Sequence, residues 1–335
     1  MKALVTGATG LVGSHIAERL LAQGHHVRAL ARKTSNLDHL RATGVEVVFG
    51  DVENRSSLPP ALNGIEVVVH AAARVTPGWG SWPQFEATIV KGTENMLWAS
   101  ANAGVSRFLH VSSCDIYVEA CHGGILANES TPCEITFTPN TYYECAKLQA
   151  DKLVFDYKML ERLQVSAIRP GWVYGPRDRL LCDRIARQLE MPIVMWPGKA
   201  NPRIPLIYAS DVADCAIMVA TSEKAVGQCY NIGPPCEVRL RDFAAAMARA
   251  LGRPEPNIFV PYGLAYAACV VVEAWSKLSR AKEMPYLNRA SLGHLKSEIL
   301  LDVSKVRREL GWEPKVSIDE GVKLYVEWRR RQKKG

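Results

Sequence analysis

A tyrosine and a lysine stand four residues apart in the segment "NTYYECAKLQ", which spans residues 140 to 149. Residues at this spacing are neighbours on one face of a helix, so the ammonium of Lys147 could lower the pKa of the Tyr143 phenol. A phenol tuned in this way is a proton donor. The adjacent Tyr142 lacks such a partner, because residue 146 is alanine. By itself the spacing also suits an ordinary solvated helical face, so the surrounding elements must decide.

Three glycines near the beginning of the sequence have the spacing of a phosphate-binding turn. In "VTGATGLVGSHIAERL" they are Gly7, Gly10 and Gly13, placed between a predicted strand over 2–6 and a predicted helix. Glycine permits a tight turn and close approach of the backbone to a pyrophosphate, whose charge the helix N-terminus stabilises. The strand before the glycines and the helix after them favour this interpretation over a purely structural turn.

Apolar runs alternate with helix-period segments through the first half of the chain. Such runs are typical of strands that are buried on both faces, which predicts an α/β fold with a doubly wound parallel sheet. The expected strands cover 2–6, 26–30, 45–51, 65–72, 107–113 and 165–171, and a helix at 209–222 and a strand at 227–233 return to the sheet. The predicted dinucleotide-binding domain is 1–170 plus about 206–233, and the smaller C-terminal substrate domain is about 171–205 and 234–320.

Composition sets broad limits on the class of protein. Nine cysteines without CxxC or CxxH spacing suggest neither a disulfide framework nor a metal site, and we expect a reducing cytoplasm. No secretory signal is evident, and the apolar run Tyr262–Val272 is too short to span a bilayer, which suits a buried or interfacial helix. The net charge of +7 is largely due to the basic tail at 329–335. We interpret that tail as frayed and solvated, with no nucleic-acid role and membrane contact as the minor alternative.

Several motifs together resemble the extended short-chain dehydrogenase/reductases, and the similarity covers nearly the whole chain. The motifs are TGxxGxxG at Thr6–Gly13, "GD" at 50–51, "HAAA" at 70–73, "VSS" followed by Tyr117, YxxxK at Tyr143–Lys147, and "RPGWVYGPRD". The pattern is most similar to the 3β-hydroxysteroid dehydrogenase and dihydroflavonol reductase group. This resemblance implies a Rossmann fold and an NAD(P)-dependent enzyme.

The resemblance also implies roles for individual residues. Tyr143 would be the acid/base, Lys147 would bind the nicotinamide ribose, and Ser113, rather than its neighbour Ser112, would orient the substrate oxygen. Asp51 would contact the adenine, whereas His70 would be a packed strand residue. The full set of expected cofactor contacts is Thr6, Gly7, Thr9, Gly10, Leu11, Val12, Gly13, Arg32, Lys33, Asp51, Val52, Ala71, Ala72, Ala73, Tyr143, Lys147, Pro170 and Val173.

One position departs from the family pattern. The family usually has an asparagine in "NVxGT", but this chain reads "IVKGT", which places Ile89 there. Because that asparagine supports the hydrogen-bond network of the active site, the proton relay would need water or another neighbour.

The choice of cofactor is read at the end of the second predicted strand. An NAD enzyme places a carboxylate there for the ribose 2′-hydroxyl, whereas a 2′-phosphate requires a cation. This chain has Ala31 followed by Arg32 and Lys33. The pattern favours NADP(H), with NAD(H) as the alternative and a solvated basic loop as the purely structural explanation.

Two enzyme classes and one binding class compete for the reaction. The first is a ketone reductase or secondary-alcohol dehydrogenase, the second a nucleotide-sugar epimerase or dehydratase that retains NAD, and the third a non-catalytic dinucleotide sensor. The expected diphosphate ligands are replaced by Trp172, Ile204 and the "LGHL" segment at 292–295. An apolar ketone substrate is therefore favoured, with the segment Tyr262–Val272 as its lid. The expected substrate contacts are Ser113, Trp172, Tyr174 and Arg203.

A homodimer would form through helices at Glu94–Ala101 and Lys147–Leu160.

Overall fold

The computed structural model of the chain describes residues 1–76, 79–121, 124–156, 163–234, 236–279, 285, 288–293 and 298–333. Its centre is a seven-stranded sheet with the order β11-β7-β5-β4-β1-β2-β3, in which every neighbouring pair is parallel. The strands are β1 (Lys2–Thr6), β2 (His26–Ala31), β3 (Glu46–Phe49), β4 (Val67–His70), β5 (Arg107–Val111), β7 (Gln164–Pro170) and β11 (Cys229–Ile232). The predicted doubly wound parallel sheet is confirmed.

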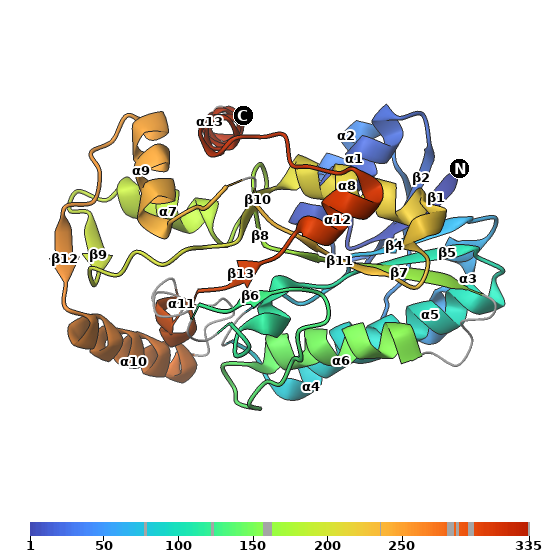
Figure 1. Cartoon of the computed structure of the whole chain (residues 1–335), viewed down its shortest axis with the longest axis horizontal. Coiled ribbons are helices and arrows are strands. Elements are labelled where there is room, and N and C mark those ends of the chain that lie inside the picture. Colours follow the sequence, from blue (N-terminus) through green and yellow to red (C-terminus); the bar gives the residue numbers. More distant parts are fainter. Residues whose placement is uncertain are drawn as a thin grey trace.

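Helices cover both faces of this sheet (Figure 1). One face carries α1 (Leu11–Ala22), α2 (Asp38–Thr43), α8 (Ala209–Thr221) and α12 (Ser304–Leu310), and the other carries α3 (Pro59–Leu62), α4 (Trp82–Phe85), α5 (Gly92–Asn102) and α6 (Tyr142–Asp156). The central strand β4 is buried at every residue, because apolar side chains on both of its faces meet a helical layer. Short connections are the 3₁₀ helices at 55–57, 114–117 and 223–225 and a π-helix at Glu86–Lys91.

A smaller lobe lies beyond the carboxyl ends of the strands. It contains the parallel pairs β8 (Trp172–Tyr174) with β10 (Leu206–Tyr208) and β9 (Met195–Pro197) with β12 (Ile258–Val260). Its helices are α7 (Cys182–Leu189), α9 (Leu240–Leu251), α10 (Tyr262–Leu278), α11 (Arg289–Gly293) and α13 (Ile318–Gln332). A third pair, β6 (Leu126–Ala127) with β13 (Leu300–Leu301), joins the two parts of the chain. The lobe has a hydrophobic core of its own, which includes Phe243 and Tyr325.

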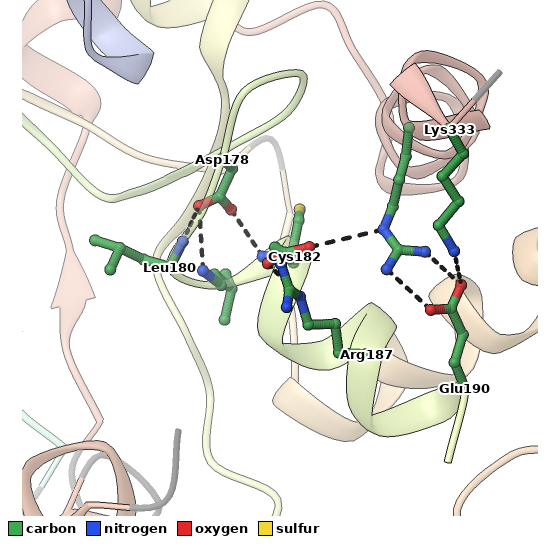
Figure 2. Close-up of polar contacts among 9 residues, drawn as sticks. Asp178, Leu180, Cys182, Arg187, Glu190 and Lys333 are labelled. Atoms are coloured by element: carbon green, nitrogen blue, oxygen red, sulfur yellow. Dashed lines mark hydrogen bonds and ion pairs between the residues drawn. The ribbon is translucent and has the colours of Figure 1, made fainter. Parts of the chain in front are cut away.

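Polar contacts fix the position of α7 at both of its ends (Figure 2). The buried Asp178 carboxylate accepts hydrogen bonds from the backbone N–H groups of Leu180 (2.8 Å) and Cys182 (2.8 Å), which caps the helix start. At the other end Glu190 pairs with Arg329 and with Lys333 (3.0 Å), both from the end of α13. The basic segment that the sequence suggested to be a frayed tail is therefore helical to Gln332, and Arg329, Arg331 and Lys333 are each in an ion pair. Its last two residues lie outside the described residues.

Two further expectations, the substrate lid and the dimer interface, concern helices that the structure describes at least in part. The expected lid Tyr262–Val272 corresponds to the first part of α10, in which Ala265 is buried in the core of the smaller lobe and Val270 is 42% exposed, and its role as a lid stays a prediction. The helices expected to form a dimer correspond to α5 and α6. Residues 157–160 of the second lie outside the described residues, and the dimer stays a prediction.

Within the described residues, no helix has both the length and the hydrophobicity that a transmembrane span requires.

Candidate active site

The turn between β1 and α1 has the geometry of a phosphate-binding loop. Gly7 has a φ of +68°, and a Cβ there would lie 2.6 Å from the carbonyl oxygen of Ala71. A Cβ on Gly13 would lie 2.4 Å from the carbonyl oxygen of Gly7, so both positions exclude a side chain. Gly10 caps α1 without a side-chain hydrogen bond, and the first turn holds no acidic residue. These features fit a bound pyrophosphate, to which the backbone N–H groups of Leu11, Val12 and Gly13 would be offered.

Thr6 supports this turn from inside the protein. Its side chain is fully buried, and its hydroxyl bonds the Nδ1 atom of His70 (2.8 Å) and accepts from the backbone N–H of Ala72 (3.2 Å). We therefore retain Thr6 as a supporting residue and not as a side-chain contact of the cofactor. His70 also bonds Thr93 (3.1 Å) and is buried, in agreement with the packed strand residue that the sequence suggested.

The other expected cofactor contacts lie mostly at the carboxyl ends of strands. Arg32 and Lys33 follow β2 and are exposed, with no side-chain ion pair among the described residues. Asp51 accepts a hydrogen bond from the backbone N–H of Glu53 (3.0 Å), and Val52 packs beneath Gly92. The remaining positions are Thr9 in the glycine turn, Ala71, Ala72 and Ala73 after β4, Pro170 at the end of β7, and Val173 in β8.

Ser113, Tyr143 and Lys147 come together at the end of β5 and the start of α6. Their exposed fractions are 7%, 7% and 3% respectively. The Lys147 ammonium donates a hydrogen bond of 2.8 Å to the carbonyl oxygen of Val111, the last residue of β5. Burial lowers the pKa of Lys147 to about 8, and the negative charges of Asp151 and Asp115 oppose that shift. The lysine is thus held in place by the sheet edge itself.

The environment of Tyr143 differs from the expectation that Lys147 lowers its pKa. Burial raises the phenol pKa well above its usual value, and the negative charge of Asp115 raises it further. A hydrogen bond with Ser113 acts in the opposite direction. Phenols whose charged form is desolvated are weak acids, so this arrangement keeps Tyr143 protonated. A phenol that retains its proton can donate it to a substrate oxygen.

Asp115 is a polar neighbour that the sequence interpretation missed. Its carboxylate accepts hydrogen bonds from the Ser113 hydroxyl (3.0 Å) and from the indole N–H of Trp172 (3.0 Å). Through these bonds it orients one expected catalytic residue and one expected substrate contact. The signal in the sequence was its place two residues after Ser113, at the end of a buried strand.

A second carboxyl group lies beside the phenol. Glu144 follows Tyr143 in the first turn of α6 and is buried, and its Oε2 atom has no hydrogen-bond partner among the described residues. Burial and the charge of Asp115 raise the pKa of Glu144 to about 8. The side of the site next to Asp115 therefore contains two carboxyl groups, those of Asp115 and Glu144, and the Glu144 carboxyl can bind and release a proton near neutral pH.

The opposite side of Tyr143 is apolar. Ile89 is 1% exposed and lies in one hydrophobic cluster with Phe85, Tyr143 and Ala146. It belongs to the π-helix Glu86–Lys91, an irregularity that occurs often near functional sites. The position at which the family has asparagine thus offers no polar atom here, and the polar contacts of the site come from Ser113 and Asp115.

The expected substrate contacts are dispersed more widely. Trp172 is half-buried beside Asp115, but Tyr174 is fully buried and packs against Tyr208 and Phe243, so we do not retain Tyr174 as a substrate contact. Arg203 is half-buried and pairs with Glu298 at 2.8 Å. The side chains of Ile204 and Leu292 lie in the core of the smaller lobe, and residues 294–295 lie outside the described residues.

A parallel sheet with a glycine turn after its first strand and a buried serine, tyrosine and lysine at its carboxyl edge defines a dinucleotide-dependent enzyme site. Comparison with protein families agrees with this class. Residues 3–233 match the model of the NAD dependent epimerase/dehydratase family. The chain belongs to that family, and it is an enzyme of the extended short-chain dehydrogenase/reductase type.

Individual relatives and solved structures extend over the whole chain. A 2-alkyl-3-oxoalkanoate reductase from Shewanella oneidensis is 28% identical over 333 residues, which cover 96% of this chain and 84% of the relative. A 3-beta-hydroxysteroid dehydrogenase from Mycolicibacterium neoaurum is 26% identical, and the alignment covers 96% of this chain and 89% of the relative. Among solved structures, this chain is similar to a dTDP-glucose 4,6-dehydratase from Streptomyces venezuelae with NAD and TYD bound. The TM-score is 0.79 at 24% sequence identity, and the match covers 100% of this chain and 98% of the dehydratase chain. The last likeness supports the fold alone.

Tyr143→Phe should reduce turnover by about 10²- to 10⁴-fold, the usual cost of losing a general acid. The dinucleotide affinity should stay nearly unchanged, because only a hydroxyl is lost. Tyr142→Phe is the matched control, since the Tyr142 ring packs with Phe137 and Trp82 and its hydroxyl is not part of the expected mechanism. Steady-state rates and fluorescence titration of the dinucleotide measure both effects. A larger loss in Tyr142→Phe would contradict the assignment.

Asp115→Asn should shift the rate profile of alcohol oxidation to lower pH. The Asp115 charge raises the pKa of Tyr143, so its removal lowers that pKa and yields the phenolate, which is the base in oxidation, at lower pH. Glu119→Gln is the control, because the Glu119 carboxylate bonds Thr136 and not the site. An unchanged profile, or a shift to higher pH, would show that Asp115 does not tune the phenol.

Proposed function

We propose that the chain is an NADP(H)-dependent oxidoreductase that interconverts a ketone and a secondary alcohol on a largely apolar substrate. The observation that carries this proposal is the buried cluster of Ser113, Tyr143 and Lys147 at the carboxyl edge of the sheet. The site residues keep the roles given above, with Thr6 and Tyr174 removed as direct contacts. Residues 1–170 and about 206–233 would hold the dinucleotide, and about 171–205 and 234–320 would form the substrate side.

The protein's own residues suffice to bind and protonate a carbonyl oxygen. The Tyr143 phenol would donate to that oxygen and transfer its proton as the alcohol forms. The Ser113 hydroxyl has a single proton, so it would turn from the Asp115 carboxylate to donate to the same oxygen. The backbone N–H of Asp115 donates to the Ser113 hydroxyl oxygen and holds it in place, and the lysine ammonium, fixed by Val111, would bind the ribose hydroxyls. Ile89 and Phe85 exclude water from one side of the phenol. A bound nicotinamide would supply the hydride.

The basic residues after β2 support NADP(H) as the cofactor. Ala31, Arg32 and Lys33 include no carboxylate that would repel a 2′-phosphate. Both cations are exposed and lack an ion-pair partner among the described residues, so each is available to an anionic ligand. An arginine binds phosphate through two parallel N–H donors, which favours Arg32 as the principal contact.

Three features support an apolar ketone over a sugar nucleotide. The relatives named above include a reductase of 2-alkyl-3-oxoalkanoates and a hydroxysteroid dehydrogenase. Arg203 is neutralised by Glu298, so it is poorly suited to a diphosphate. The positions of Ile204 and Leu292 lie in an apolar core. The nucleotide-sugar epimerase or dehydratase remains the second candidate, because the fold is shared with the Streptomyces venezuelae dehydratase.

A substrate panel tests the proposed function. The purified protein should oxidise NADPH stoichiometrically with 3-oxo acids or steroid ketones and should leave UDP-sugars unchanged. An apolar ligand gains about 25 cal/mol per Å² of surface removed from water, whereas a buried diphosphate without cationic partners would be strongly disfavoured. Loss of NADPH absorbance and chromatography of the sugars provide the measurement. Interconversion of UDP-sugars without ketone-dependent NADPH loss would establish the second candidate instead.

Arg32→Ala should weaken NADPH binding by about 1.5–3 kcal/mol, which is the cost of a lost charge-assisted hydrogen bond. NADH binding should change little, because it lacks the 2′-phosphate. Arg41→Ala, an exposed arginine on the nearby α2, is the matched control and should affect neither cofactor. Titration calorimetry of each variant with NADPH and with NADH measures the four affinities to be compared. Equal weakening of NADPH and NADH by Arg32→Ala would refute the assignment.

A further inference from the structure

The helix α10 presents an uncharged apolar face to the outside of the protein. Its most exposed side chains follow one stripe at helical spacing: Leu264 (65% exposed), Val271 (67%), Trp275 (68%) and Leu278 (78%). Tyr266 and Val270 are exposed as well, but at about 100° per residue they lie on the flank of the helix next to its buried side. Among the residues of α10 whose side chains are described, every exposed one is uncharged. A surface helix of a protein in water normally has a polar outer face, so this face requires a partner.

The opposite stripe of α10 anchors the helix to the smaller lobe. Ala265 and Cys269 are buried in the core of that lobe. Glu273, four residues further along the same stripe, pairs with Arg289 at 2.8 Å and is also buried. The charge of Glu273 is thereby neutralised. The outward direction of the apolar stripe is therefore fixed by packing and by an ion pair.

A second group of exposed apolar side chains adjoins this helix. The strands β9 and β12 pair Met195 with Ile258, and these side chains are 50% and 47% exposed. Met191 and Ile193 precede β9 and are exposed as well. Since β12 leads directly into α10, both groups belong to the end of the molecule that lies at the left of Figure 1. The exposed apolar side chains are concentrated at this end of the described structure.

The charge pattern favours a lipid surface as the partner of this face. Tryptophan, here Trp275 on the exposed stripe, is a residue that prefers the boundary between headgroups and acyl chains. The sequence 276–284, at and after the end of α10, carries Lys277, Arg280 and Lys282 against one acidic residue. An apolar stripe followed by basic residues is complementary to an anionic membrane, whose headgroups attract lysine and arginine near the surface.

We propose that α10 docks the protein on the surface of an anionic lipid bilayer, with Leu264, Val271, Trp275 and Leu278 inserted among the acyl chains near the headgroups. The helix lies in the plane of the interface and does not cross it. In combination with the proposed function, on which this step rests, docking would bring the substrate lobe to a reservoir of apolar ketones. Binding to lipid itself requires neither cofactor nor substrate.

Vesicle sedimentation with the full-length protein tests the docking surface. The protein should pellet with vesicles of equal parts phosphatidylglycerol and phosphatidylcholine, less with phosphatidylcholine alone, and less again when salt is added. Val271→Asp should weaken binding more than tenfold, because it places a charge within the inserted stripe. Val271→Leu should preserve binding. Met218→Asp, on the exposed surface of α8, is the matched control and should bind as the unmodified protein does.

Folding and activity are measured separately from lipid binding. Val271→Asp should keep the unmodified melting temperature, since Val271 lies on an exposed surface. Trp275→Asp, on the same stripe but outside the expected lid at 262–272, should also lose vesicle binding and still reduce a short, water-soluble ketone at the unmodified rate. Absence of sedimentation with anionic vesicles, or equal sedimentation of Val271→Asp, would overturn the proposal. The proposal would also be overturned if the unmodified protein did not bind vesicles and formed a dimer that Val271→Asp converted to a monomer. A second copy of the chain, and not lipid, would then cover the stripe. Vesicle binding without ketone reduction would reject only the proposed function.

Discussion

The parallel direction of the seven strands is the constraint on which the site depends. Because all strands end at the same edge, the glycine turn after β1, the residues after β4 and the serine after β5 are brought side by side although they are far apart in the sequence. The bond from Lys147 to the carbonyl oxygen of Val111 links α6 to that edge. A shift of β5 by one residue would move this carbonyl group and disturb both the lysine and Ser113.

The buried cluster is balanced by charge as well as by geometry. Arg169, near the end of β7, pairs with Asp151 at 2.5 Å and donates to the hydroxyl of Tyr117. Asp151 lies one turn after Lys147 on α6 and opposes the loss of its proton. Burial lowers the pKa of Lys147 to about 8, and Asp151, itself held by Arg169, keeps that pKa from falling further. Removal of one partner of a buried pair leaves an uncompensated charge, which is the costly outcome in such networks.

The sheet could be predicted from the sequence because each central strand is apolar along its whole length. The strand patterns at 2–6, 26–30 and 107–113 all correspond to observed strands, and the order of the motifs indicates the family that the family comparison confirms. Side-chain surroundings were not accessible in the same way. Tyr174 was expected beside the substrate but lies in a core that α9 and β10 complete, and both elements are distant in sequence. The role of Asp115 likewise depends on Trp172, which the fold brings to it from β8.

The contacts of α13 with α7 have a consequence for the order in which the protein folds during synthesis. The last strand of the sheet, β11, ends at Ile232, whereas Arg329 and Lys333, which bind Glu190, emerge about one hundred residues later. The dinucleotide half can therefore assemble on the ribosome while α7 still lacks its ionic partners. Domains generally fold as units as the chain emerges. Until residues 318–333 are free, the apolar surfaces of α7 and α9 remain uncovered, and this interval is when a chaperone would have access to them.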